Sequence, residues 1–298
     1  MPEAAPRHTG RPDAFDLDPD PGALVELLAA GMIVGALISV VTAPVGVSGA
    51  VFLLPVQLSL FGVPSPAVTP TNLLYNVVAG PGALWRYRRD GALRGPLARR
   101  LVLGTVPGVV IGAVIRVFAL PSPTVFRLLI AALLVPLGLW LCARTLRQGS
   151  LRRGSSQQDP QQDSQQDHAH AEPSGRAVSG LALAVGVIGG VYGIGGGSLL
   201  GPILVGRGMP VGRVAPAALA STFVTSLVGA ATFALLGLVS PGDVAPDWSL
   251  GLACGLGGLV GGYLGARLQP RLPETALRLT LGILAVALGA LYALQTLR

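Results

Sequence analysis

Residues 27–85 read LLAAGMIVGALISVVTAPVGVSGAVFLLPVQLSLFGVPSPAVTPTNLLYNVVAGPGALW, a run of 59 residues without a charged side chain. A helix needs about 20 mainly apolar residues to cross a bilayer, so the run predicts about three membrane segments. Proline and glycine divide it near residues 44–46 and near residues 62–66. The run therefore places the chain in a membrane and marks where its helices are interrupted.

The composition of the whole chain supports the same class. Hydrophobic residues make up 51% of the 298 residues and charged residues 12%, whereas soluble domains carry about 25% charged residues. This balance argues against soluble enzymes, disordered proteins and nucleic-acid binders. The net charge of +7 comes from arginines in short loops between apolar runs, where they orient a chain in the membrane. We therefore expect an all-α, multi-pass protein of the plasma membrane, in contact with the lipid bilayer and not with nucleic acid.

Changes in composition along the chain predict four parts. Residues 1–23 form a polar tail and residues 24–148 a first membrane repeat. Residues 149–175 contain three QQD triplets and no apolar face, which is typical of a disordered linker. Residues 176–298 form a second membrane repeat. Its first apolar stretch, 177–206, is too long for one simple span and favours a broken helix.

The second half repeats the first at nearly constant offsets. The offset is 147 for four pairs: Gly46 and Gly193, Gly49 and Gly196, Leu53 and Leu200, Pro55 and Pro202. It is 146 from Gly62 and Gly208 through Val78 and Val224, and 153 for Gly104, Gly108 and Gly112 against Gly257, Gly261 and Gly265. The small residues of these last two triplets are typical of helix-packing faces.

Arginine differs between matching loops. Residues 86–100 contain six arginines, whereas residues 240–247 contain none and two aspartates. Because basic loops stay in the cytoplasm, we expect 86–100 and the linker inside and 240–247 outside. These assignments agree only if each half crosses the membrane an odd number of times. The halves are then inverted repeats of five segments each, a common plan for secondary transporters.

The most distinctive local motif is the glycine run at residues 193–198, GIGGGS, followed by Pro202. Unwound backbone in a membrane is tolerated where it is buried or lines a cavity, and a helix that restarts after it presents N–H groups to an anion. Gly195, Gly196, Gly197 and Ser198 are therefore candidate substrate-binding residues. The alternative interpretation is close helix packing through small residues.

The first half offers a matching set of polar residues. Ser48 and Gly49 occupy its break, and Asn72 and Asn76 lie four residues apart on the following helix, as Ser221 and Thr225 do in the second half. Polar side chains in a membrane are expected to face the bundle interior, as ligands or as contacts between helices. The GVSG sequence around Ser48 resembles the serine motif of intramembrane proteases. That chemistry needs a base, and the three histidines (His8, His168 and His170) all lie in the tail or the linker.

Acidic residues are missing from the predicted spans. Carriers of cations or protons usually keep a carboxylate in their path, so a site of N–H, hydroxyl and amide groups suits an anion or a neutral solute. Cys142 and Cys254 have no histidine neighbours, and two histidines in a linker make a weak metal motif. We therefore expect no metal, no cofactor and no catalytic residue.

Residues 193–197, Pro202 and the stretch 215–226 resemble the sulfite exporter TauE/SafE family of membrane transporters. The resemblance extends over residues 24–143 and 177–296, although Ser48 and Ala50 stand where the second half has glycines. It implies transport of sulfite, sulfonates or related small anions. A carrier of a small neutral metabolite is the main alternative, followed by a membrane-embedded enzyme or an assembly factor.

Overall fold

The computed structural model describes residues 21–93, 96–119, 123–154, 175–239 and 245–297. Within these ranges every regular element is a helix and no strand occurs, so the all-α prediction is confirmed. Five of the described helices are long and apolar enough to cross a membrane. The chain is a polytopic helical membrane protein.

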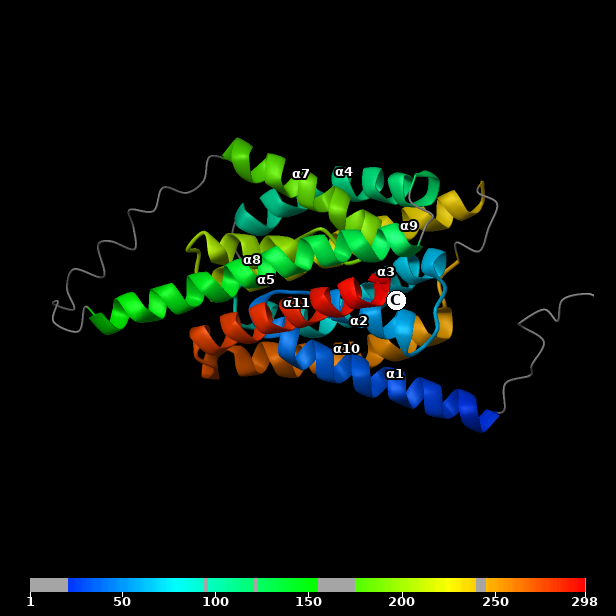
Figure 1. Cartoon of the computed structure of the whole chain (residues 1–298), viewed down its shortest axis with the longest axis horizontal. Coiled ribbons are helices and arrows are strands. Elements are labelled where there is room, and N and C mark those ends of the chain that lie inside the picture. Colours follow the sequence, from blue (N-terminus) through cyan, green and yellow to red (C-terminus); the bar gives the residue numbers. More distant parts are fainter. Residues whose placement is uncertain (1–20, 94–95, 120–122, 155–174, 240–244, 298) are drawn as a thin grey trace, which may run out of the picture.

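The helices of the two halves follow the same order (Figure 1). The first half contains α1 (Pro21–Thr42), the short 3-10 helix η1 (Ala43–Val45), α2 (Ala50–Ser59), α3 (Ser65–Arg89), α4 (Pro96–Phe118) and α5 (Pro123–Gly154). The second half contains α7 (Gly175–Tyr192), α8 (Gly197–Gly206), α9 (Val211–Gly237), α10 (Trp248–Leu268), the 3-10 helix η2 (Gln269–Arg271) and α11 (Glu274–Leu297).

The helices break where proline and glycine predicted. In the first half α1 ends before Pro44 and α3 begins after Pro64, and in the second half α7 ends before the glycine run. However, α2 and α8 have ten residues each, which is about 15 Å of helix and half the thickness of the hydrocarbon core. The stretch from residue 27 to residue 85, in which about three crossings were expected, thus contains two long helices, α1 and α3, and the short α2, which cannot cross the membrane by itself.

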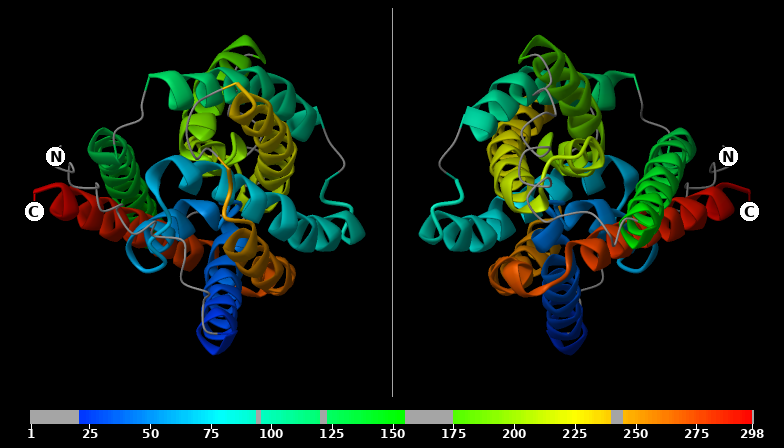
Figure 2. Two further views of the ribbon diagram at one scale, coloured as in Figure 1. Left: turned by 90° about the vertical axis from the view of Figure 1, so that its right-hand side faces the viewer. Right: turned by 90° about the vertical axis from the view of Figure 1, so that its left-hand side faces the viewer.

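The repeat is visible in the elements themselves. The bounds of α2 and α8 coincide at the offset of 147, and Pro64 and Pro210 precede α3 and α9 at the offset of 146. One helix of each half packs against the other half: α1 contacts α10, and α7 contacts α4. Seen end-on, α1 and α10 lie on one side of the molecule and α4 and α7 on the opposite side (Figure 2). Each half therefore completes the other.

Matched helices at the centre run antiparallel. Gly80 of α3 lies against Phe223 of α9, and Gly229 of α9 lies against Leu73 of α3, so the two sequences run in opposite directions. The pair α5 and α11 behaves in the same way, since Gly138 approaches Val286 and Gly289 approaches Val135.

The glycine triplets of α4 and α10 are packing faces, as predicted. A Cβ atom on Gly108 would lie 2.3 Å from the Leu183 carbonyl oxygen of α7. A Cβ atom on Gly261 would lie 2.1 Å from the Ala36 carbonyl oxygen of α1. Leu183 and Ala36 are themselves 147 residues apart, so the two contacts are equivalent. Close approach of backbones through glycine is how membrane helices associate.

The predicted linker and tail fall mostly outside the described residues, as do His8, His168 and His170. At their edges, α1 begins at Pro21 and α5 continues to Gly154. Helix thus extends a few residues into the ranges predicted as tail (1–23) and linker (149–175).

Candidate functional site

The two helix breaks have the same backbone conformation. Gly46 has a φ of 76° and its counterpart Gly193 a φ of 68°, a left-handed conformation that glycine adopts without a steric penalty. Each break therefore turns the chain at an equivalent residue and then restarts it as the short helix α2 or α8. The backbone is irregular here because the glycine permits it.

A polar stripe on α3 contacts both breaks. Thr69, Asn72 and Asn76 are spaced three and four residues apart, on one face of the helix, and all three are buried. Thr69 Oγ1 lies 3.5 Å from the Val191 carbonyl oxygen at the second break. Asn72 Nδ2 donates to the Ala50 carbonyl oxygen at 3.1 Å, and Asn76 Oδ1 accepts from Ser48 Oγ at the first break. The polar face of α3 thus ties the two breaks together.

Helix α9 holds the second break with its own hydroxyl groups. Thr225 Oγ1 accepts a hydrogen bond from the Gly196 amide at 2.9 Å and donates to the Ser221 carbonyl oxygen. The Ser221 hydroxyl shares a hydrogen bond of 2.9 Å with Thr105 of α4. Ser198 Oγ donates to the Ile194 carbonyl oxygen within the break. The predicted second-half residues therefore form one connected group whose hydroxyls already have partners within the protein.

A cavity of about 30 Å³ lies beside the first break, which is room for about two water molecules. Ser48, Gly49 and Asn76 line it from the predicted set, with Thr42 of α1 and Thr222 of α9. Thr222 also lies 3.4 Å from Ser198, so the cavity reaches the edge of the second break. Groups from both halves therefore meet at this cavity.

Two polar groups at the cavity have no hydrogen-bond partner. They are Asn76 Nδ2 and Thr42 Oγ1, on side chains that are 3% and 2% exposed. A buried amide or hydroxyl without a partner is costly, and such groups in native proteins usually serve a ligand, an ion or a water. The amide nitrogen can only donate, and a hydroxyl can donate. The cavity is therefore prepared for an acceptor.

The second break, in contrast, is closely packed. A Cβ atom on Gly197 would lie 1.9 Å from the Ala218 carbonyl oxygen, and one on Gly196 would lie 2.5 Å from the Thr105 Cβ atom. Ser198 borders a different hollow of about 20 Å³ with apolar walls. The structure therefore brings together only part of the predicted site. The predicted residues that are absent from the lining of the cavity are Gly195, Gly196, Gly197, Ser198, Asn72, Ser221 and Thr225.

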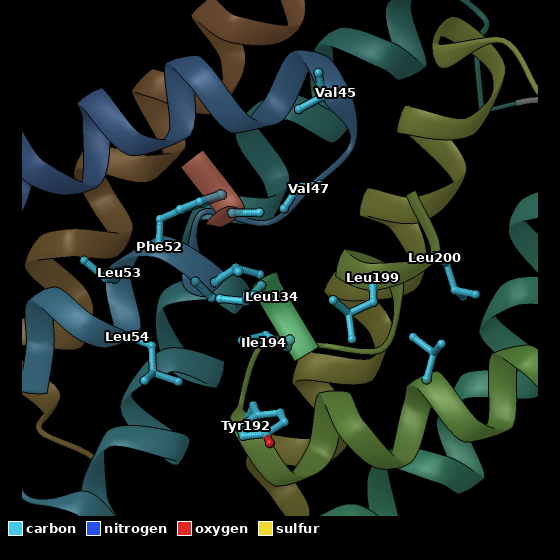
Figure 3. Packing of buried hydrophobic residues seen from close by; sticks show 14 of the residues in the cluster. Val45, Val47, Phe52, Leu53, Leu54, Leu134, Tyr192, Ile194, Leu199 and Leu200 are labelled. Atoms are coloured by element: carbon cyan, nitrogen blue, oxygen red, sulfur yellow. The ribbon is translucent and has the colours of Figure 1, made fainter. Parts of the chain in front are cut away.

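Apolar side chains fill the space between the breaks (Figure 3). Val47 and Phe52 from the first half and Ile194 and Leu199 from the second half belong to one buried cluster, which Leu134 of α5 joins. In a membrane, where the lipid is as apolar as these side chains, close van der Waals packing holds such a cluster together. This cluster fixes the breaks relative to each other.

Several residues of the site were not predicted. Thr42 and Thr222 line the cavity, and Tyr75 lines it with its hydroxyl 2.6 Å from Ser39. Arg116 is buried at the end of α4. A search of the spans for basic as well as acidic residues would have found Arg116. Nothing local distinguishes Thr42 or Tyr75 from other residues of an apolar helix.

The described residues contain no cluster of three or more histidine, cysteine or acidic side chains that would hold a metal ion. The side chains at the cavity offer hydroxyl and amide groups. Ser48, the serine of the protease-like motif, donates to an asparagine. This arrangement suits binding through hydrogen-bond donors better than acid–base chemistry.

A polytopic helical bundle with paired broken helices, and with a cavity between its helices that some polar side chains line, is an architecture found in secondary transporters. The family described as Sulfite exporter TauE/SafE matches residues 31–292. The chain therefore belongs to this family of membrane transporters, which confirms the resemblance noted in its sequence. No curated protein and no solved structure matches the chain.

Proposed function

We propose that the protein is a secondary transporter that moves a small anion, sulfite or an organosulfonate, across the plasma membrane. The observation that carries the proposal is the cavity at the first break, where Asn76 Nδ2 and Thr42 Oγ1 have no partner. The oxygens of sulfite and sulfonates accept hydrogen bonds, and the Asn76 amide and the Thr42 hydroxyl both lack an acceptor. Family membership supports the same class of substrate.

In this proposal Ser48, Gly49 and Asn76 contact the anion at the cavity. The other predicted residues complete the path when the second break opens. Gly195 and Gly196 correspond to Ser48 and Gly49 at the offset of 147, which supports this role, because a repeated structure can present either half-site in turn. The small cavity volume corresponds to a closed form of the path. The residues that we assign to the path opened at the second break are Asn72, Ser221, Thr225, Gly195, Gly196, Gly197 and Ser198.

The proposal includes inverted repeats, each of five segments, with both termini outside. It requires that α2 and α8, each together with the break before it, carry the chain across the membrane. Two matched helix pairs, α3 with α9 and α5 with α11, run antiparallel, as inversion across the membrane plane requires. The last turn of α3 carries Arg86, Arg88 and Arg89, which supports a cytoplasmic position for that end.

Cysteine labelling of intact cells tests the topology. With an impermeant thiol reagent we expect a cysteine at Ser240 to react and a cysteine at Ser156 to remain protected until the cells are opened. The unmodified chain, with Cys142 and Cys254, gives the background. Labelling at Ser156 but not at Ser240 would reverse the orientation.

Flux into proteoliposomes tests the substrate class. Sulfite and methanesulfonate are the anions, and methanesulfonamide is a neutral molecule of nearly the same shape as methanesulfonate. We expect the purified protein to transport both anions and to prefer methanesulfonate over methanesulfonamide. Equal flux of methanesulfonate and methanesulfonamide would favour a carrier of neutral metabolites. The absence of any flux would favour an enzyme or an assembly factor.

Thr42→Val tests the cavity with a nearly isosteric change. Loss of one neutral donor should reduce anion flux by about 5–10-fold, which corresponds to about 1 kcal/mol. Stability should stay equal or rise, because the buried hydroxyl has no partner to lose. Thr145→Val is the matched control, since the Thr145 hydroxyl is also buried but donates to Leu141 within its own helix. Equal flux in the two variants would remove Thr42 from the site.

A further inference from the structure

Among the described residues, Arg116 is the charged side chain that the fold buries, with 3% of its surface exposed. It lies in the last turn of α4, and its Nε donates to Thr69 Oγ1 at 3.3 Å. Through Thr69 it reaches the end of α7, where Val191 precedes the second break. Removing an ion from water costs several kcal/mol, so an arginine at this position needs a reason.

The matching position in the other half shows what the structure requires. At the offset of 153, Arg116 corresponds to Gln269, and Pro44 corresponds to Val191 at the offset of 147. Gln269 Nε2 donates to the Pro44 carbonyl oxygen at 2.5 Å, and Pro44 lies in η1, which follows α1 at the first break. A neutral amide therefore holds this break. A neutral hydrogen-bond donor is therefore sufficient at the matching position, and the positive charge of Arg116 is not needed for this contact.

A buried polar stripe connects Arg116 to the cavity. Thr69, Asn72 and Asn76 follow one another on the same face of α3, and none of them is more than 3% exposed. Seven residues separate Thr69 from Asn76, about 10 Å along the helix axis. The charge thus lies at one end of a polar track whose other end is the cavity.

We propose that Arg116 sets the preference of the transport path for anions over neutral solutes. The inference rests on the proposed function and adds a residue to it. The cavity supplies neutral donors, which bind acceptors of either kind. The guanidinium supplies a fixed positive potential near the track, in surroundings of low dielectric constant where a charge acts over a longer distance than in water. This potential stabilises an anion in the cavity, whereas it does not stabilise a neutral molecule of the same shape.

The test compares Arg116→Gln and Arg116→Lys with the wild type in proteoliposomes. Arg116→Gln copies the residue of the other half, and Arg116→Lys keeps the charge. Selectivity is the ratio of the methanesulfonamide and methanesulfonate concentrations that halve uptake of labelled methanesulfonate. We expect this ratio to fall about 10-fold in Arg116→Gln, a difference of about 1.4 kcal/mol between the two ligands. It should stay within about 3-fold in Arg116→Lys.

Arg86→Gln is the matched control, because it removes an arginine that is ion-paired with Asp90 at the opposite end of α3. It should leave the ratio unchanged. Wild-type selectivity in Arg116→Gln would overturn the inference while leaving the proposed function intact. Equal loss in Arg116→Gln and Arg116→Lys, together with a lower unfolding temperature in detergent, would also overturn it in favour of a structural role. A wild-type protein that does not prefer the anion would overturn the proposed function, and this inference with it.

Discussion

We expect Asn76→Asp to reduce anion flux by about 100-fold or more, since placing like charges together costs several kcal/mol. The substitution keeps the shape of the side chain. The Ser48 hydroxyl can still donate to the remaining oxygen, as it does to Asn76 Oδ1. What changes is the unpartnered Nδ2 atom at the cavity, which becomes an acceptor on a negatively charged group. A carboxylate there would repel an incoming sulfonate.

The pH dependence separates charge from misfolding in this variant. A protonated carboxyl is neutral and can donate, so flux should recover as the pH is lowered until the introduced carboxylate gains a proton. Methanesulfonate is the substrate to use, because it stays an anion over the range in which carboxyls titrate. Flux per inserted molecule that equals the wild-type value at neutral pH would exclude Asn76 from the site. A loss that persists at low pH would point to altered packing instead.

We expect Gly197→Ala to destabilise the fold by about 3 kcal/mol or more, at the upper end of the cost of overpacking. The new methyl group would lie 1.9 Å from the Ala218 carbonyl oxygen. The methyl group would be attached to the backbone of α8, and the carbonyl oxygen belongs to the backbone of α9. The clash can therefore be removed only if the two helices move apart. Membrane insertion should survive, because alanine adds apolar surface. The measurement is the unfolding temperature of the purified protein in detergent.

Gly212→Ala is the control for this change. Gly212 also lies in a helix, and a Cβ atom there meets nothing within 4 Å. Alanine should therefore be neutral or stabilising by up to about 1 kcal/mol. Equal stability of the Gly197→Ala and Gly212→Ala proteins would show that the second break is looser than the structure indicates. Flux should fall with stability in Gly197→Ala, since the same contact joins the second break to α9.

The close packing at Gly197 and Gly196 also changes what a bulky substitution reports. The sequence makes Gly196 a candidate for contact with substrate and Gly261 a representative of helix packing. In the structure both face a neighbour within 2.5 Å of an added Cβ atom. Loss of flux in Gly196→Leu therefore does not separate binding from packing. Substitutions of Thr42 and Asn76, which line the cavity, separate the two effects.

The class of protein, the positions of the helix breaks and the repeat could all be predicted from the amino-acid sequence. These properties are local: the length of an apolar run decides whether a segment stays in the membrane, and glycines that adopt a positive φ lie where the helices are interrupted. The matched φ angles of Gly46 and Gly193 follow from residue type at equivalent positions. The family resemblance rests on the same local motifs.

Which half carries the cavity depends instead on how the helices pack in three dimensions. The sequence predicted binding residues at both breaks, but the cavity lies beside Ser48 and Gly49 of the first break. The physical reason is that glycine leaves space only if its neighbours stay away. Around Gly196 and Gly197 the neighbours Thr105 and Ala218 close in and fill the space, because close packing in the membrane is itself stabilising. Such contacts join residues from different helices, and no local pattern reveals them.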